Sequence, residues 1–191
     1  MTTTAVDLYW LPLGAGGWLV RANGRAYETL AALVQRRERC DLYHSALEVR
    51  LAGERHVIEQ APAWNLRQRD RGVVAEGPVG APWLGRFKAF RYEVRRWRDG
   101  VIPDRGEAVD SPRRLSSDPG RARELLDLVA LVPTATWGRD EQRAGEMWNS
   151  NSLISWLLAR SGHDTSVIAP PAGGRAPGWR AGLVVAGRAS R

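Results

Sequence analysis

Cysteine is nearly absent from this sequence: Cys40 is the only one among 191 residues. One cysteine cannot form a disulfide within the chain, and it cannot build a cysteine-based zinc site. The three histidines, His44, His56 and His163, lack the spacing of a metal-binding motif such as HExxH. We therefore predict that the protein binds no metal and needs no cofactor.

Long apolar runs are missing as well. No stretch approaches about 18 uninterrupted apolar residues, so no membrane span is predicted. The N-terminal stretch MTTTAVDLYWLPLGAGG has no basic segment before its apolar part, unlike a secretory signal. We expect a cytoplasmic protein with a single domain over residues 1–187 and a frayed tail at 188–191.

Lysine is as scarce as cysteine. Lys88 is the only one, so arginine carries nearly all the positive charge of a chain whose net charge is +7. Arginines cluster at residues 36–39, 67–71 and 95–98, as they do in patches that contact nucleic acid or anionic lipid. A solvated face has the same composition, because acidic residues accompany each cluster. Nucleic-acid binding is disfavoured, and contact with a membrane surface stays open.

The spacing of apolar residues predicts an α+β fold, with a small antiparallel sheet packed by helices. In chain order, the expected elements are a helix at 25–38, strands at 43–51 and 55–61, a short strand at 72–75, a strand at 86–97, helices at 119–131 and 150–161, and a strand at 182–186. Proline and glycine predict loops over 62–85, apart from that short strand, and over 101–117.

The turn between the strands at 43–51 and 55–61 decides which side chains share a face. An even number of turn residues puts His44 and Glu59 on the same face of the hairpin, whereas three residues put them on opposite faces. A carboxylate beside an imidazole fixes the tautomer and raises the pKa, as a general base requires. Ala46 is small and leaves room for another element near His44.

The stretch EMWNSNSLISWLL, residues 146–158, predicts a helix start. Asn149 is the expected cap, which places Ser150 in the first turn on the same face as the apolar residues that follow. Exposed backbone N–H groups and the positive end of the helix dipole surround a hydroxyl at that position. Serine needs an adjacent base to become a nucleophile, and His44 is the candidate base.

The order of these motifs resembles the circularly permuted NlpC-type branch of the papain-like superfamily, which includes lecithin:retinol acyltransferase, the H-rev-type phospholipid acyltransferases and the PPPDE peptidases. In that branch a histidine on an early strand is followed by a polar residue on the next strand. A nucleophilic cysteine comes later, at the start of a helix. Here YHSALEV (43–49), VIEQAP (57–62) and NSNSL (149–153) stand at these places. The resemblance covers roughly residues 40–160.

The resemblance implies a permuted papain-like fold and a hydrolase or acyltransferase that acts on an ester, amide or thioester. Ser150 would take the place of the cysteine and attack the substrate, His44 would accept its proton, and Glu59 would orient His44. The expected lining of the substrate groove is Trp148, Asn149, Asn151 and Ser152.

Serine in place of cysteine leaves other readings open, because a thiol is partly ionised at neutral pH and a hydroxyl is not. One alternative is a catalytically inactive protein of the same fold that uses the groove as a binding module. The chain can also be a basic protein that contacts anionic lipid or nucleic acid through its arginines, or the resemblance can be accidental.

Overall fold

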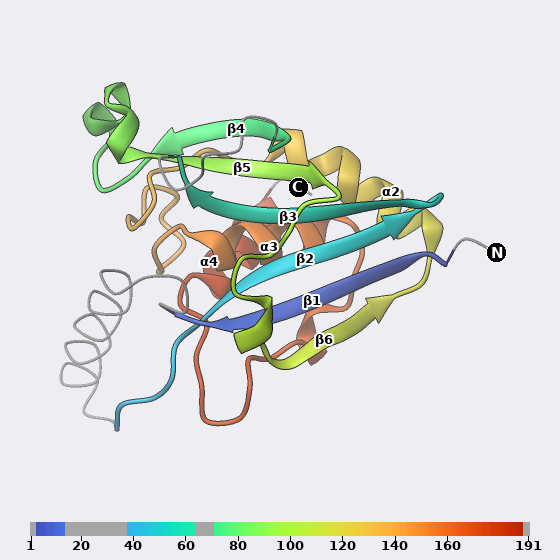
Figure 1. Cartoon of the computed structure of the whole chain (residues 1–191). Helices are drawn as coiled ribbons and strands as arrows, with labels where there is room; N and C mark the ends of the chain where they lie inside the picture. Colours follow the sequence, from blue (N-terminus) through green and yellow to red (C-terminus); the bar gives the residue numbers. More distant parts are fainter. Residues whose placement is uncertain (1–2, 14–37, 64–70, 189–191) are drawn as a thin grey trace.

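The computed structural model describes residues 3–13, 38–63 and 71–188 and has the α+β class that the sequence predicts (Figure 1). The strands are β1 (Ala5–Pro12), β2 (Tyr43–Leu51), β3 (Glu54–Pro62), β4 (Val73–Pro78), β5 (Arg91–Arg98) and β6 (Val109–Ser116). The α-helices of the described part are α2 (Pro119–Leu128), α3 (Ser150–Arg160) and α4 (Trp179–Arg188). Short 3₁₀ turns are η1 (Pro82–Arg86), η2 (Lys88–Phe90), η3 (Arg105–Glu107), η4 (Val129–Leu131) and η5 (Thr165–Val167).

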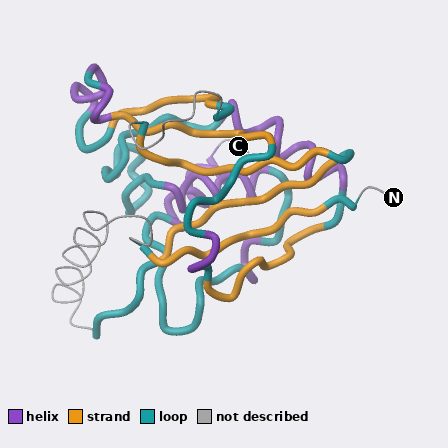
Figure 2. The backbone as a smooth tube through the Cα atoms, in the orientation of Figure 1, coloured by secondary structure: helices purple, strands orange, loops and turns teal. Residues whose placement is uncertain are grey.

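The six strands form one antiparallel sheet in the order β4-β5-β3-β2-β1-β6 (Figure 2). A two-residue turn, Ala52-Gly53, joins β2 to β3, and Leu51 pairs with Glu54 across it. Both turn residues have positive φ, 52° and 86°, which matches the right-handed twist of the strands. The predicted hairpin is therefore confirmed, but Glu54 belongs to β3, so the turn has two residues and not the three that the expected strand bounds leave.

One face of the sheet is covered by the helices (Figure 1). Leu8 of β1, Leu47 of β2 and Ile58 of β3 belong to a single apolar cluster with Leu125 of α2 and Leu153 of α3. Strand side chains alternate between faces, so neighbouring members of this cluster on one strand lie two residues apart, as Val6, Leu8 and Trp10 do. We call this the helix face.

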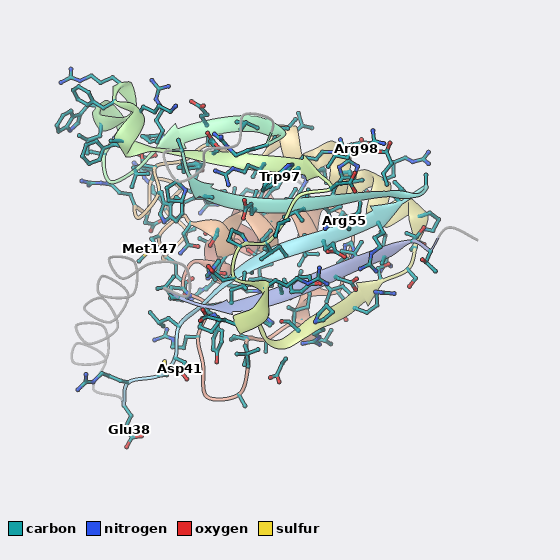
Figure 3. All side chains as sticks on the ribbon, viewed as in Figure 1. Glu38, Asp41, Arg55, Trp97, Arg98 and Met147 are labelled. Carbon is teal, nitrogen blue, oxygen red and sulfur yellow. The ribbon has the colours of Figure 1, made fainter. Side chains whose placement is uncertain are left out.

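The other face carries a second and smaller apolar cluster. Tyr9, Ala46, Val57 and Trp97 belong to it, and Ile102 of the β5–β6 connection packs on them. Figure 1 shows this connection, with η3, crossing over the strands, and Figure 3 labels Trp97 on β5. We call this the loop face.

The strands β2 and β3 separate toward one end. They pair only where residues 47–51 meet residues 54–58. Beyond that point β2 continues beside β1, and β3 continues beside β5. In Figure 1 the two strands diverge at this end, and α3 lies behind the opening. The opening lies between the part of β2 that contains His44 and the part of β3 that contains Glu59.

Several expectations about the elements are wrong. Residues 101–117 are not all loop, because β6 pairs there with β1 as an edge strand that contains Pro112 and two register shifts. Residues 182–186 lie within helix α4 rather than in a strand. The strand expected to begin at residue 86 begins at Arg91, after η1 and η2. The helix expected at 25–38 lies outside the described residues, except for Glu38.

The starts of two helices follow the sequence closely. The Asp118 carboxylate accepts from the Arg121 backbone N–H at 2.9 Å, and Pro119 occupies the first turn of α2. Asn149 caps α3 in a capping box with Ser152. The sequence predicts Asn149 as the cap of α3, and it offers Ser117 or Asp118 as the cap of α2, of which the structure uses Asp118.

Candidate functional site

The start of helix α3, residues 149–152, is fixed by hydrogen bonds in several directions. The Asn149 side-chain oxygen accepts from the backbone N–H groups of Asn151 and Ser152, at 2.9 and 3.3 Å. Its amide nitrogen donates to the Pro177 carbonyl at 2.9 Å. The Ser152 hydroxyl accepts from the Asn149 backbone N–H and donates to the Gly178 carbonyl at 2.7 Å. The α3 start is thereby tied to the segment before α4.

Asn151 ties the same helix start to strand β2. Its side-chain nitrogen donates to the Tyr43 and Pro177 carbonyls, both at 2.9 Å, and its oxygen accepts from the Ser45 hydroxyl at 2.8 Å. The helix that carries Ser150 therefore begins beside the strand that carries His44, as the resemblance leads us to expect.

Three of the four residues expected to line the groove have almost no exposed surface. Trp148, Asn151 and Ser152 are buried, with exposed fractions of 1%, 2% and 0%. Asn149 is half-buried, and its side chain is used by the cap and by Pro177. The polar groups of this stretch hold the helix start in place, which explains why small polar residues stand there.

Ser150 has a different position from its neighbours. It is the first residue of α3 and is 5% exposed. The hydrogen bonds that join the α3 start to β2 and to residues 177–178 come from Asn149, Asn151 and Ser152. The Ser150 hydroxyl lies at the positive end of the helix dipole, where negative charge is stabilised.

The side chain of His44 lies on the opposite face of β2 from the side chain of Ser45. Ser45 faces Asn151 on the helix face, whereas His44 shares the loop face with Ala46. Within the described residues, no hydrogen bond joins His44 to Ser150. Burial lowers the pKa of His44 to about 4, so the imidazole is neutral and weakly basic at pH 7.

Glu59 lies on the same face as His44, because the turn at Ala52-Gly53 has two residues. Its carboxylate accepts a hydrogen bond from Arg95 Nη1 at 2.7 Å. Burial raises the pKa of Glu59, and the Arg95 guanidinium opposes this shift. The carboxylate that was expected to orient His44 is therefore held by an arginine of the neighbouring strand β5.

That arginine belongs to a row of alternating charges. Arg95 is 1% exposed and also donates from Nε to Glu93 at 2.9 Å. Arg71 Nη2 donates to Glu93 at 2.6 Å. Burial alone would raise the pKa of Glu93, but the hydrogen bonds from Arg71 and Arg95 hold it below its usual value. The row Arg71–Glu93–Arg95–Glu59 balances two cations with two carboxylates.

Reasoning from the sequence missed Gln60. It is 6% exposed, and among the described residues neither its side-chain oxygen nor its nitrogen has a hydrogen-bond partner. It lies on the helix face, because Ile58 and Val94 on that face are its neighbours along β3 and across to β5. The alternation that placed Glu59 with His44 was enough to place Gln60 with Ser45. The alternation does not show which face of the sheet helix α3 covers.

The arginine cluster at 95–98 is not a basic patch. Arg95 is buried on the loop face, and Arg96 points to the helix face, where Nη1 donates to the Leu126 carbonyl at 3.2 Å. Arg98 is exposed and pairs with Glu54 at 3.1 Å. A strand sends successive side chains to opposite faces, so adjacent arginines cannot form one surface there. Most arginines of the clusters at 36–39 and 67–71 lie outside the described residues.

The comparisons with known proteins name no relative. The chain matches no family model, and neither the curated proteins nor the solved structures give a match. Across residues 3–13, 38–63 and 71–188, no helix is long and apolar enough to cross a membrane. The same part of the chain has no cluster of three or more histidine, cysteine or acidic side chains that could hold a metal ion.

Proposed function

We propose that the chain is a catalytically inactive module of the permuted papain-like class that acts by binding. The order of the three motifs supports this class, and so does the position of the α3 start beside β2. The observation that carries the inactive assignment is the pairing of Glu59 with Arg95, because the carboxylate expected to orient His44 is neutralised by a guanidinium instead.

The acid–base chemistry points the same way. A general base works best when its pKa lies near the operating pH, and a carboxylate beside the imidazole raises the pKa toward that range. His44 has the opposite shift, to about 4, because burial is not offset by a partner charge. A serine hydroxyl has a far higher pKa than a thiol, so a weak base leaves Ser150 unactivated.

A hydrolase or acyltransferase that uses Ser150 is the second candidate. The position of Ser150 favours it, because this serine begins α3 while its neighbours make the hydrogen bonds that anchor the helix. In this candidate the helix dipole and a backbone N–H of the first turn would stabilise the developing oxyanion.

A thiol at position 150 separates the two candidates. In a Cys40→Ser background, Ser150→Cys provides a single cysteine whose alkylation by iodoacetamide can be followed against pH. A nearby imidazole that acts as a base would speed alkylation at neutral pH. If His44 plays no such part, adding His44→Asn should leave the rate within about twofold. A decrease on the order of tenfold or more would assign His44 a catalytic role and favour the second candidate.

The wild-type protein offers an independent check with a fluorophosphonate probe. We expect no labelling that disappears in Ser150→Ala, because an unactivated serine does not react with such probes. Ser152→Ala is the matched control at the same helix start. Labelling that requires Ser150 and not Ser152 would contradict the inactive assignment.

A further inference from the structure

The segment between β4 and β5 forms a tip with an unusual composition. We call residues 82–90, which comprise η1 and η2, the aromatic tip. It contains the only two phenylalanines of the chain, Phe87 and Phe90, and the only lysine, Lys88. No residue of η1 or η2 is buried. A chain that packs its core without phenylalanine places both of them here.

The large apolar side chains of the tip are on the surface. Trp83 is 62% exposed, Phe87 is 47% exposed and Phe90 is 43% exposed. Figure 1 shows the tip extending beyond the sheet at the end opposite to the N-terminus, and Figure 3 shows its side chains projecting from the body of the molecule. Three exposed aromatic rings in nine residues form an apolar patch, which marks an interaction site more often than isolated exposed residues do.

The tip is held in a defined shape. Arg91, at the start of β5, donates from Nε to the Gly85 carbonyl at 2.5 Å and from Nη2 to the Arg86 carbonyl at 3.4 Å. It also pairs with Glu76 across the base of the tip at 3.3 Å. Arg139 Nε donates to the Gly80 carbonyl at 2.5 Å. These bonds fix the backbone, so the exposed rings do not depend on a partner for their arrangement.

The charge of the tip has one sign. Between Glu76 and Glu93 the sequence contains three basic residues and no acidic one. Arg91 is used at the base, while Arg86 lies beside two aromatic rings and the exposed Lys88 stands between Phe87 and Phe90 in the sequence. The Arg86 guanidinium lies 5.4 Å from the centre of the Trp83 ring and 4.7 Å from that of Phe87. Stacked on the rings in this way, the cation keeps its charge at the surface of the apolar patch.

We propose that the aromatic tip docks the protein on a membrane surface that contains anionic lipid. Tryptophan is enriched at the boundary between headgroups and acyl chains, where its ring is apolar and its N–H can reach a polar group. Arg86 and Lys88 would lie at the level of the lipid phosphates, where each basic residue strengthens binding by about fivefold.

The shape of the tip favours a lipid surface over a protein partner. A stable protein interface buries about 800 Å² on each side, which a convex tip of nine residues does not supply by itself. A bilayer needs no complementary groove, because it deforms around the side chains that enter it. This proposal is independent of the one above, because Ser150, His44 and Glu59 do not belong to the tip.

Sedimentation of the full chain with vesicles tests the proposal. The vesicles are phosphatidylcholine alone or phosphatidylcholine mixed with phosphatidylserine. We expect binding to the mixed vesicles that weakens by at least about tenfold in Trp83→Ala/Phe87→Ala and in Arg86→Glu/Lys88→Glu. The matched controls are Leu131→Ala, at another exposed apolar residue, and Arg123→Glu, at an exposed arginine of α2; both should bind as wild type does.

Brominated acyl chains add a measurement of position. Wild-type tryptophan fluorescence should be quenched by vesicles that carry them, and Trp83→Phe should bind with similar strength but lose most of the quenching. The proposal is overturned if the wild-type protein does not sediment with the mixed vesicles, or if the tip variants bind as tightly as the wild type. Binding that survives the tip variants but disappears at high salt would place the contact on other arginines.

Discussion

The two faces of the sheet are buried in different ways. The helix face holds Leu8, Leu47 and Ile58 against the helices, and it is stabilised by apolar contact. The loop face holds buried carboxylates, Asp7 and Glu48 among them, that are paired with arginines. Changes on an apolar face act through lost or strained packing, whereas a buried charge requires its partner. His44 and Glu59 therefore lie on the face where charged side chains are fixed by ion pairs with one another.

Removing Arg95 should have the largest effect on this contrast. The change Arg95→Met leaves Glu59 and Glu93 buried without their shared cation. We expect the free energy of unfolding to fall by about 3–5 kcal/mol, measured by urea denaturation.

Arg98→Met is the matched control, because Arg98 lies on the same strand and is exposed. It should change the free energy of unfolding by less than about 0.5 kcal/mol. If Arg95→Met costs no more than Arg98→Met, the charged row contributes nothing to stability and the contrast between the faces is lost.

The helix face can be tested where α4 meets α3. A Cβ atom on Gly182 would lie 2.1 Å from Ser155 Oγ and 2.2 Å from the Ser152 carbonyl oxygen. Gly182→Ala should therefore force the helices apart and cost about 1–3 kcal/mol in thermal or urea unfolding.

Gly187→Ala in the same helix is the matched control. No atom of the residues that the structure describes lies within 4 Å of its added Cβ beyond its own helix neighbours, so alanine should be neutral or stabilise by up to about 1 kcal/mol through helix propensity. Equal effects of the two substitutions would show that the α3–α4 approach is not tight.

An effect that appears only at acidic pH concerns His44. Its pKa is about 4 in the folded protein and near 6.5 in the unfolded chain, so between these values only the unfolded chain binds the proton. The contribution of neutral His44 is complete above pH 6.5 and is lost as the pH falls toward 4. It should amount to about 2 kcal/mol at pH 5.

Comparison with His44→Gln isolates this contribution from that of the carboxylates. The wild-type protein should lose about 2 kcal/mol more than the variant between pH 7 and pH 5, measured by urea unfolding at each pH. Equal losses would mean that His44 is solvated and that its pKa is near the ordinary value.

Local signals in the sequence predicted the local structure well. Asn149 was predicted as a helix cap and Asp118 as one of two candidate caps beside Ser117, and the hairpin and its alternation follow from residues 43–61. Strand β1 was not predicted, because its apolar and polar residues do not alternate. Both of its faces are covered, and residues 5–11 are all buried. Residues 182–186 were predicted as a strand because a short apolar run that begins with glycine is typical of one. Gly182 instead allows α4 to approach α3 closely, and this contact between distant segments has no local signal.

The candidate site could be predicted only in part. Alternation puts His44 and Glu59 on one face only if the turn has an even number of residues, and the structure supplies that number. The position of α3 is set by contacts between distant segments, which the local pattern does not contain. The partner of Glu59 was hidden for the same reason. Arg95 looked like one member of a surface cluster, because nothing in the sequence shows that β5 lies beside β3.

The two-residue turn at Ala52-Gly53 also bears on how this protein can diverge. Substitutions along β2 and β3 exchange one side chain at a time and leave every neighbour on its own face. An insertion or deletion of one residue in the turn instead turns every side chain of β3 to the opposite face of the sheet. Glu59 and Gln60 would then exchange faces. In a lineage of such proteins, the length of this hairpin should therefore be inherited more strictly than the identity of any residue in it.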